Sequence, residues 1–165
     1  MLTDTLCTRC GLCCDGTLLG DVELTGPDEA TRLELLGLDV DTDDADVELL
    51  ALPCAGLRGT RCSIYAQRPL CCRTFECRLL QDAQRGAVIE DDALRRIAMA
   101  RAQVQTVEAL LAGIEVGPAR LPLAERCADA LAASSGATPA AARTGAALTE
   151  AIDTLTRTIR TTFLD

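Results

Sequence analysis

The chain of 165 residues is 48% hydrophobic but only 2% aromatic, carries a net charge of −9, and contains ten cysteines and no histidine. The absence of histidine excludes histidine-ligated zinc sites and hydrolases that use a Ser-His-Asp or Cys-His arrangement. The acidic charge argues against a nucleic-acid surface and against an anionic membrane surface, and the scarcity of aromatic residues favours packed helices over a sandwich or barrel.

Four cysteines lie close together near the N-terminus, as Cys7, Cys10, Cys13 and Cys14. Adjacent cysteines form a disulfide with each other only under strain, because the bond needs Cα atoms farther apart than one peptide step. Thiolates in a tight turn can instead meet at one metal, and Gly11 allows that turn a positive φ. The stretch therefore predicts a cysteine-ligated metal site that the rest of the chain completes and covers.

The segment that follows predicts two short strands and a helix. Alternating polar and apolar residues indicate a strand at residues 17–24, and the apolar run at residues 47–52 indicates a second one. Between them, a proline followed by two acidic residues starts a helix at residues 27–36. We expect Leu33 and Leu36 to form the buried stripe of this helix.

Five aspartates between residues 39 and 46 suggest a calcium-binding loop. Such a loop requires glycine at its sixth position and glutamate at its twelfth. Counted from Asp39, these two positions hold Asp44 and Leu50. The run therefore predicts a solvated acidic turn.

A second group of cysteines follows the proline at position 53. Its members are Cys54, Cys62, Cys71, Cys72 and Cys77. A glycine-containing loop separates the first two, and a short helical turn that starts at Arg68 and Pro69 would bring the later ones inward.

From residue 79 onward cysteine nearly disappears and Ala, Leu, Arg, Glu and Thr dominate. Apolar residues at helical spacing predict helices at about 78–84, 91–111 and 123–133 and a last helix from about residue 139. We therefore predict an α+β, mostly helical chain. A small metal-organised, cysteine-rich module with a few short strands occupies residues 1–85, and a helical hairpin or bundle at residues 86–165 packs on it. The C-terminal helices could also pair with a second copy in a homo-oligomer.

The N-terminus does not have the pattern of a signal peptide. Asp4 and Cys7 interrupt the apolar segment that such a peptide needs, and no basic region precedes them. No stretch approaches the roughly 18 apolar residues of a membrane span. We expect a cytoplasmic protein without a membrane partner, in which thiols stay reduced and a cysteine framework indicates metal or redox chemistry.

Further short motifs surround the cysteines of the second group. After the first block come Pro53-Cys54, Cys62-Ser63-Ile64-Tyr65, Arg68-Pro69, Cys72-Arg73-Thr74-Phe75 and Cys77. In this order the motifs resemble the CxxCxxCC family, also called the YkgJ type, over roughly the first half of the chain. The resemblance implies zinc or iron chelation. The flagellin lysine-N-methylase has a similar cysteine block, and this more distant resemblance implies an iron–sulfur or methyl-transfer role.

The family resemblance implies eight metal ligands. They are Cys7, Cys10, Cys13, Cys14, Cys54, Cys62, Cys72 and Cys77. Cys71 departs from the family pattern beside Cys72, so it is kept as an additional candidate ligand. Cys127 lies outside the motif, at helical spacing from apolar neighbours, and we expect it to be a small buried hydrophobe.

Three polar or aromatic side chains of the motif are expected to lie around the metal. Arg68 and Arg73 could donate hydrogen bonds to metal-bound thiolates, or they could form surface ion pairs. Tyr65 is expected to pack over the site.

The sequence leaves the metal open. Eight thiolates could hold one or two zinc ions, or a [4Fe–4S] cluster with four cysteines to spare. We expect a metal-binding protein with a structural, storage or delivery role, because no catalytic motif accompanies the cysteines. An iron–sulfur redox or methyl-transfer enzyme component is one alternative, and a thiol redox switch is another. The expected partner is a metal ion, with no nucleic acid.

Overall fold

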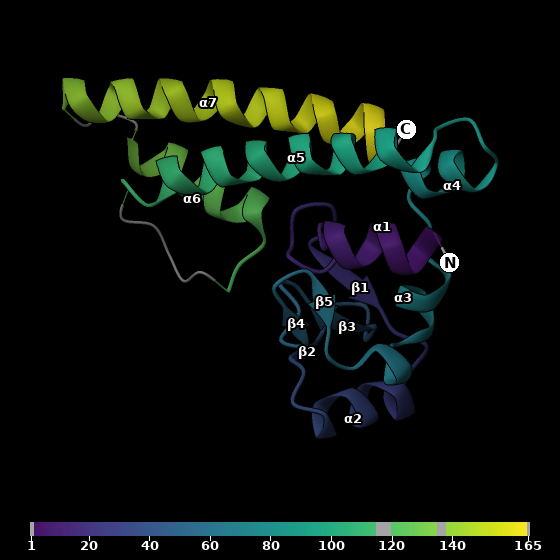
Figure 1. The fold of residues 1–165 in the computed structure, drawn as a ribbon. Coiled ribbons are helices and arrows are strands. Elements are labelled where there is room, and N and C mark those ends of the chain that lie inside the picture. Colours follow the sequence, from purple (N-terminus) through teal and green to yellow (C-terminus); the bar gives the residue numbers. More distant parts are fainter. Residues whose placement is uncertain (1, 115–119, 135–137, 165) are drawn as a thin grey trace.

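The computed structural model describes residues 2–114, 120–134 and 138–164, and in these ranges the chain is α+β and mostly helical (Figure 1). In chain order its elements are α1 (Leu2–Cys10), β1 (Asp21–Glu23), α2 (Pro27–Leu35), β2 (Val40–Thr42), β3 (Glu48–Ala51), β4 (Leu57–Arg58), β5 (Arg61–Cys62), the 3₁₀ turn η1 (Tyr65–Gln67), α3 (Leu70–Thr74), α4 (Arg78–Gln84), α5 (Glu90–Leu111), α6 (Leu123–Ser134), α7 (Pro139–Ile159) and the π-helical turn η2 (Arg160–Leu164). This order confirms the predicted fold class, in which a few short strands precede packed helices.

The strands form two small antiparallel sheets. The larger has the order β1-β3-β2, and Leu50 of β3 lies opposite both Val22 of β1 and Val40 of β2. β4 and β5 form a separate hairpin. Figure 1 shows the larger sheet between α1 above and α2 below, and α2 packs Leu33 with Leu50 in a small apolar core.

The C-terminal end of α2 differs in one respect from the prediction. Leu33 is fully buried as expected, but Leu36 is 42% exposed, so its place in the buried stripe is wrong. Leu36 follows the last helical residue, and its N–H donates to the carbonyl of Leu33 while Gly37 turns the chain with φ 79°. Helical periodicity no longer applies beyond that turn, and Ala30 takes the buried position instead.

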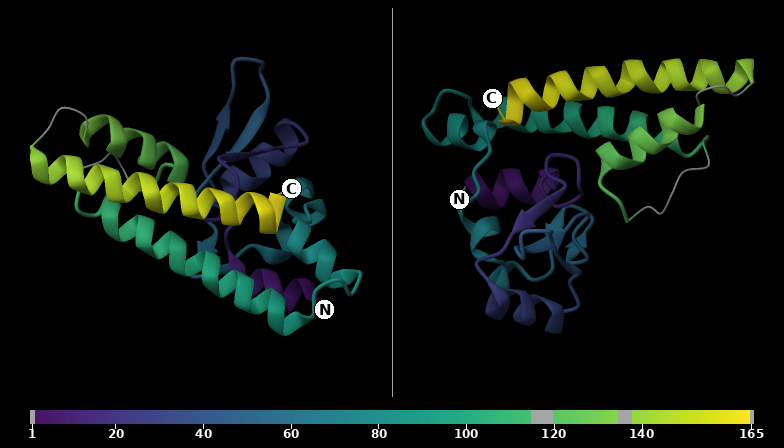
Figure 2. Two further views of the ribbon diagram at one scale, coloured as in Figure 1. Left: turned by 90° about the horizontal axis from the view of Figure 1, so that it is seen from above. Right: turned by 180° about the vertical axis from the view of Figure 1, so that it is seen from behind.

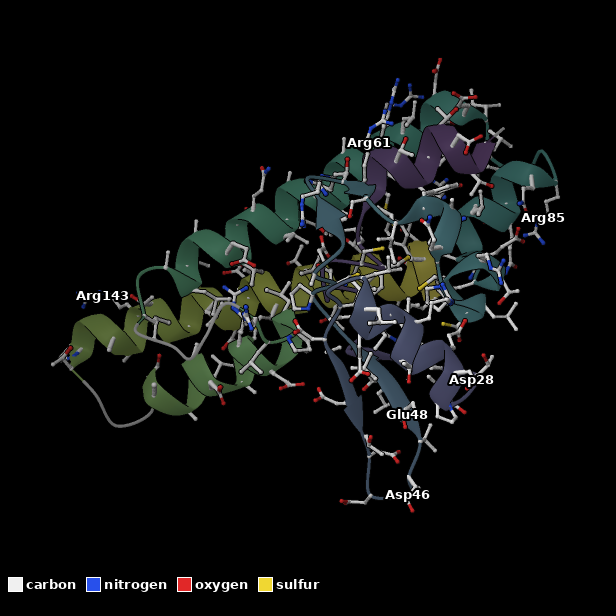
Figure 3. The ribbon with its side chains drawn as sticks, turned by 90° about the horizontal axis from the view of Figure 1, so that it is seen from below. Asp28, Asp46, Glu48, Arg61, Arg85 and Arg143 are labelled. Carbon is white, nitrogen blue, oxygen red and sulfur yellow. The ribbon has the colours of Figure 1, made fainter. Side chains whose placement is uncertain are left out.

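The acidic run forms the turn between β2 and β3. The Asp43 carboxylate accepts hydrogen bonds from the N–H groups of Ala45 and Val47 at 2.8 and 2.9 Å. Asp46 has a positive φ of 59°, and Figure 3 shows it at the tip of the hairpin, pointing away from the helices. The predicted solvated acidic turn is confirmed, because the carboxylate oxygen satisfies backbone donors of the turn.

Helix α1 lies outside the predicted elements. Leu2, Leu6 and Cys10 are four residues apart and share one helix face, which packs against α5. Gly11 ends the helix with φ 72°, which confirms the expected positive φ, but Cys7 and Cys10 lie on the helix and only Cys13 and Cys14 lie in the turn after it. A Cβ atom on Gly11 would lie 3.2 Å from the Cα atom of Thr60, so this turn also needs the small residue.

The long helices form a layer beside the cysteine-rich part. Figures 1 and 2 show α5 and α7 side by side with opposite chain directions and α6 packed next to them. One apolar core joins Ile97 of α5, Leu148 of α7 and Phe163 of η2 to Leu6 and Leu12 near the N-terminus. The division of the chain at residue 85 stays a prediction. In the described ranges no helix is long and apolar enough to span a lipid bilayer.

Candidate metal centre

Nine of the ten cysteines line a single cavity of about 440 Å³. They are Cys7, Cys10, Cys13, Cys14, Cys54, Cys62, Cys71, Cys72 and Cys77. The eight cysteines proposed as ligands are therefore brought to the same place from segments up to 70 residues apart in sequence. Cys127 is 6% exposed and packs in the helical core instead, as expected of a small buried hydrophobe.

The helical side of the cavity carries cysteines from α1, the following turn and the start of α4. Cys7 and Cys10 are one helical turn apart on α1, and the turn at Gly11 leads to Cys13. Cys77 immediately precedes α4, which contacts α1. Cys10, Cys13 and Cys77 all pack with the large helical core.

The opposite side carries cysteines held by loops and the short hairpin. The N–H of Cys54 donates to the carbonyl of Cys14 at 2.8 Å, and the N–H of Gly56 donates to the sulfur of Cys54 at 3.3 Å. β4 and β5 then place Cys62 opposite Leu57. Backbone hydrogen bonds therefore fix this group without a large core beneath it.

Burial governs the protonation of these thiols. The pKa values of Cys10 and Cys14 are raised from 9.0 to about 12, mainly by burial and in part by nearby thiols. Burial is also the main cause of the raised pKa values of Cys7, Cys13 and Cys77. In the metal-free protein these groups are neutral thiols at pH 7, so a metal must displace their protons when it binds.

The neighbouring Cys71 and Cys72 face different surroundings. The hydrogen bond between the two sulfurs lowers the pKa of Cys71 and raises the pKa of Cys72. Cys14 and Cys54 raise the pKa of Cys72 further, whereas Glu29 acts on Cys71. Cys72 therefore lies toward the other cysteines and Cys71 toward the carboxylate on α2.

Arg68 lines the cavity beside the cysteines. Its guanidinium stacks 3.7 Å from the centre of the Tyr65 ring, and its Nη1 donates to the carbonyl of Cys72 at 3.3 Å. Its charge lowers the pKa of both Cys7 and Cys14. Tyr65 and Arg73 also line the cavity with exposed side chains. A cation beside the thiols favours their ionised form, as a thiolate-bound metal requires.

Two residues that hold the first cysteine block in place, Arg101 and Thr60, were not predicted from the sequence. Arg101 of α5 donates from Nη1 to the carbonyl of Cys10 at 2.7 Å, and the Thr60 hydroxyl donates to the carbonyl of Thr8 at 2.6 Å. Arg101 falls four residues after the buried Ile97, on the inward face of its helix. An arginine on the inward face of a predicted helix is a sequence signal for a hydrogen-bond acceptor in the interior.

The cysteines suit a soft metal in their chemistry. Thiolates are the ligands that zinc, copper(I) and iron–sulfur clusters prefer. Among the residues described, no three Cys, Asp or Glu side chains converge closely enough to hold one ion. Binding would therefore require the sulfurs to move closer together around the metal.

A comparison with protein families gives one match. The family model CxxCxxCC, described as "Putative zinc- or iron-chelating domain", matches residues 6–106, which is more than half of the chain. No curated protein and no solved structure matches. The match contains every cysteine that lines the cavity and excludes Cys127. The chain therefore belongs to the CxxCxxCC family.

Proposed function

We propose that the protein binds a metal through the cysteine thiolates that line the cavity, and that this metal has a structural, storage or delivery role in the cytoplasm. The observation that carries the proposal is the gathering of nine cysteines, from residues 7 to 77, around one cavity. The proposed ligands are the eight cysteines of the family motif. Cys71 is the additional candidate, but its position toward Glu29 argues against it.

Metal binding would stabilise the part of the molecule with the smallest core. Beneath the cysteine loops only five buried apolar side chains form the small core in the described ranges, namely Leu24, Ala30, Leu33, Leu38 and Leu50. The thiolates come from α1 and the turn after it, the loop before β4, the β4–β5 hairpin, α3 and the residue before α4. A bound metal would cross-link these segments, and its binding free energy would add to the folding free energy.

The family description allows zinc or iron. When bound, zinc would supply a closed four-thiolate centre, whereas an iron–sulfur cluster would supply electron transfer. Four thiolates leave a charge of about −2 on a zinc centre, and Arg68 is placed to offset part of it.

The size of the cavity favours a second candidate, an iron–sulfur redox or methyl-transfer enzyme component. About 440 Å³ is far more than one or two ions need, since a water molecule occupies about 30 Å³. Apolar side chains such as Leu52 and Ile64 line part of the cavity. This leaves room for a polynuclear cluster or for a small substrate beside the metal.

Purification without oxygen, followed by metal and sulfide analysis and an absorption spectrum, tests the proposal. We expect a stoichiometric metal. A colourless zinc protein would support the structural, storage or delivery role, and a brown protein with equal iron and sulfide would support the enzyme component. The matched control is Cys127→Ser, which should keep the same metal content. A chain that neither contains nor takes up a thiophilic metal would contradict the proposal.

A further inference from the structure

We propose that the cavity holds two separate four-thiolate centres, and that the adjacent Cys13 and Cys14 belong to different ones. The first centre consists of Cys7, Cys10, Cys13 and Cys77. The second consists of Cys14, Cys54, Cys62 and Cys72. This assignment rests on the proposed metal-binding function and adds to it the number of centres and the ligands of each.

Packing separates the cysteines into two groups. Cys10, Cys13 and Cys77 pack with the large core formed by the long helices. Cys54 and Cys72, together with Cys71, pack with the small core between α2 and the three-stranded sheet. The two sides of the cavity therefore rest on different apolar cores, and each side carries its own cysteines.

The backbone places the remaining members of the first group. Cys7 lies three residues before Cys10 on α1, so their side chains project from neighbouring positions of the helix. The Gly11 N–H donates to the carbonyl of Cys7 at 3.2 Å, which starts the turn that carries Cys13 back toward the helix end. α4 contacts α1, and Cys77 stands at the start of α4.

A different set of hydrogen bonds places the second group. The bond from the Cys54 N–H to the Cys14 carbonyl joins two segments that are 40 residues apart in sequence. The hairpin that carries Cys62 is tied back to the same loop, since both the N–H and the hydroxyl of Ser63 donate to the carbonyl of Gly56. Hydrogen bonds therefore hold together the three segments that carry Cys14, Cys54 and Cys62.

The electrostatic neighbours of the adjacent cysteines agree with this division. After burial, the largest contribution to the raised pKa of Cys13 comes from Cys10, followed by Cys77. For Cys14 the corresponding neighbours are Cys54 and Cys62. Cys14 contributes to the raised pKa of Cys13 only after Cys10 and Cys77, so the adjacent cysteines have different main neighbours.

Arg68 lies where the two groups meet. Its charge acts on Cys7 of the first group and on Cys14 of the second. Two centres of four thiolates would bring a charge of about −4 into one cavity of an already acidic protein. One cation shared between the groups would reduce their mutual repulsion.

The test is a proton–cadmium correlation spectrum of the full chain loaded with ¹¹³Cd²⁺, which binds thiolates as zinc does and reports its own ligands. We expect two cadmium signals, each correlated with the β-protons of four cysteines in the two sets named above. A single signal, a cysteine that bridges both ions, or sets that mix the two groups would overturn the two-centre assignment while leaving thiolate binding intact. Failure to bind cadmium at all would overturn the proposed function as well.

Single substitutions provide a second readout. Cys77→Ser should remove one cadmium signal and Cys62→Ser the other, with the bound cadmium falling by half in each variant. Cys127→Ser, outside the cavity, is the matched control and should keep both signals. Loss of both signals from a variant that keeps its helical circular dichroism would contradict separate centres. If a variant does not fold, the ligand sets in the wild-type spectrum decide.

Discussion

Affinity for a thiolate-binding metal is expected to rise steeply with pH. Burial raises the pKa of Cys10 and Cys14 from 9.0 to about 12, and it also raises the pKa of Cys7, Cys13 and Cys77. A group with a raised pKa keeps its proton through the neutral range. The bound ligand is the thiolate, so each cysteine releases one proton when the metal binds.

The slope follows from the number of ligands. A centre of four thiols releases about four protons, so the logarithm of the binding constant should increase by about 4 per pH unit. This corresponds to about 5.4 kcal/mol per pH unit, at about 1.36 kcal/mol for each proton. The slope should persist across the neutral range and decrease only where the pH approaches the raised thiol pKa values.

Competition with a chromophoric chelator at several pH values between about 6 and 8 measures this slope, after correction for the protonation of the chelator. The Cys127→Ser variant should give the wild-type slope, because this cysteine lies away from the cavity. A slope of about one or less per metal would refute the reasoning. It would mean that the ligands are already ionised in the metal-free protein or are not thiols.

Three substitutions test the fold and the site together. Gly11→Ala should destabilise the protein by about 1–2 kcal/mol in urea unfolding, because φ at this position is 72°. Gly20→Ala, at a position outside the positive-φ region, should change the free energy of unfolding little. Leu33→Ala should lower the free energy of unfolding by about 2–5 kcal/mol because the side chain is fully buried. Leu35→Ala, at an 84% exposed position, should lower it by less than about 0.5 kcal/mol. Equal effects of the two substitutions would contradict the packing of α2. Cys127→Ser should lower stability by about 1–3 kcal/mol without loss of metal, and metal loss on elemental analysis would make Cys127 a ligand.

The longer elements could be predicted from the sequence because local signals define them. Apolar spacing predicted both ends of α5 to within one residue and the start of α7, and Gly86 separates α4 from α5 with φ 75°. α1 escaped prediction because only Leu2, Leu6 and Cys10 mark its inner face, and two of its nine residues read as metal ligands. β4 and β5, with two residues each, carry no periodicity at all.

The composition of the site could be predicted, but its internal arrangement could not. Cysteine spacing and the family resemblance identified the cysteines that line the cavity. Cys14 and Cys54 are brought together by a backbone hydrogen bond between residues 40 apart in sequence. The hydrogen bond from Arg101 to the carbonyl of Cys10 joins residues 91 apart. Such contacts follow from the packing of whole elements, which no local pattern of Cys, Gly and Pro encodes.

X-ray absorption at the metal edge tests the central claim, that cysteine thiolates hold the metal, most directly. The measurement uses the full chain with the metal that it carries after purification without oxygen, or with zinc added where none is retained. We predict a first coordination shell of about four sulfur atoms, at about 2.3 Å for zinc. A first shell dominated by oxygen or nitrogen would contradict the account, because it would place the metal on carboxylates or backbone groups rather than on the cysteines of the cavity.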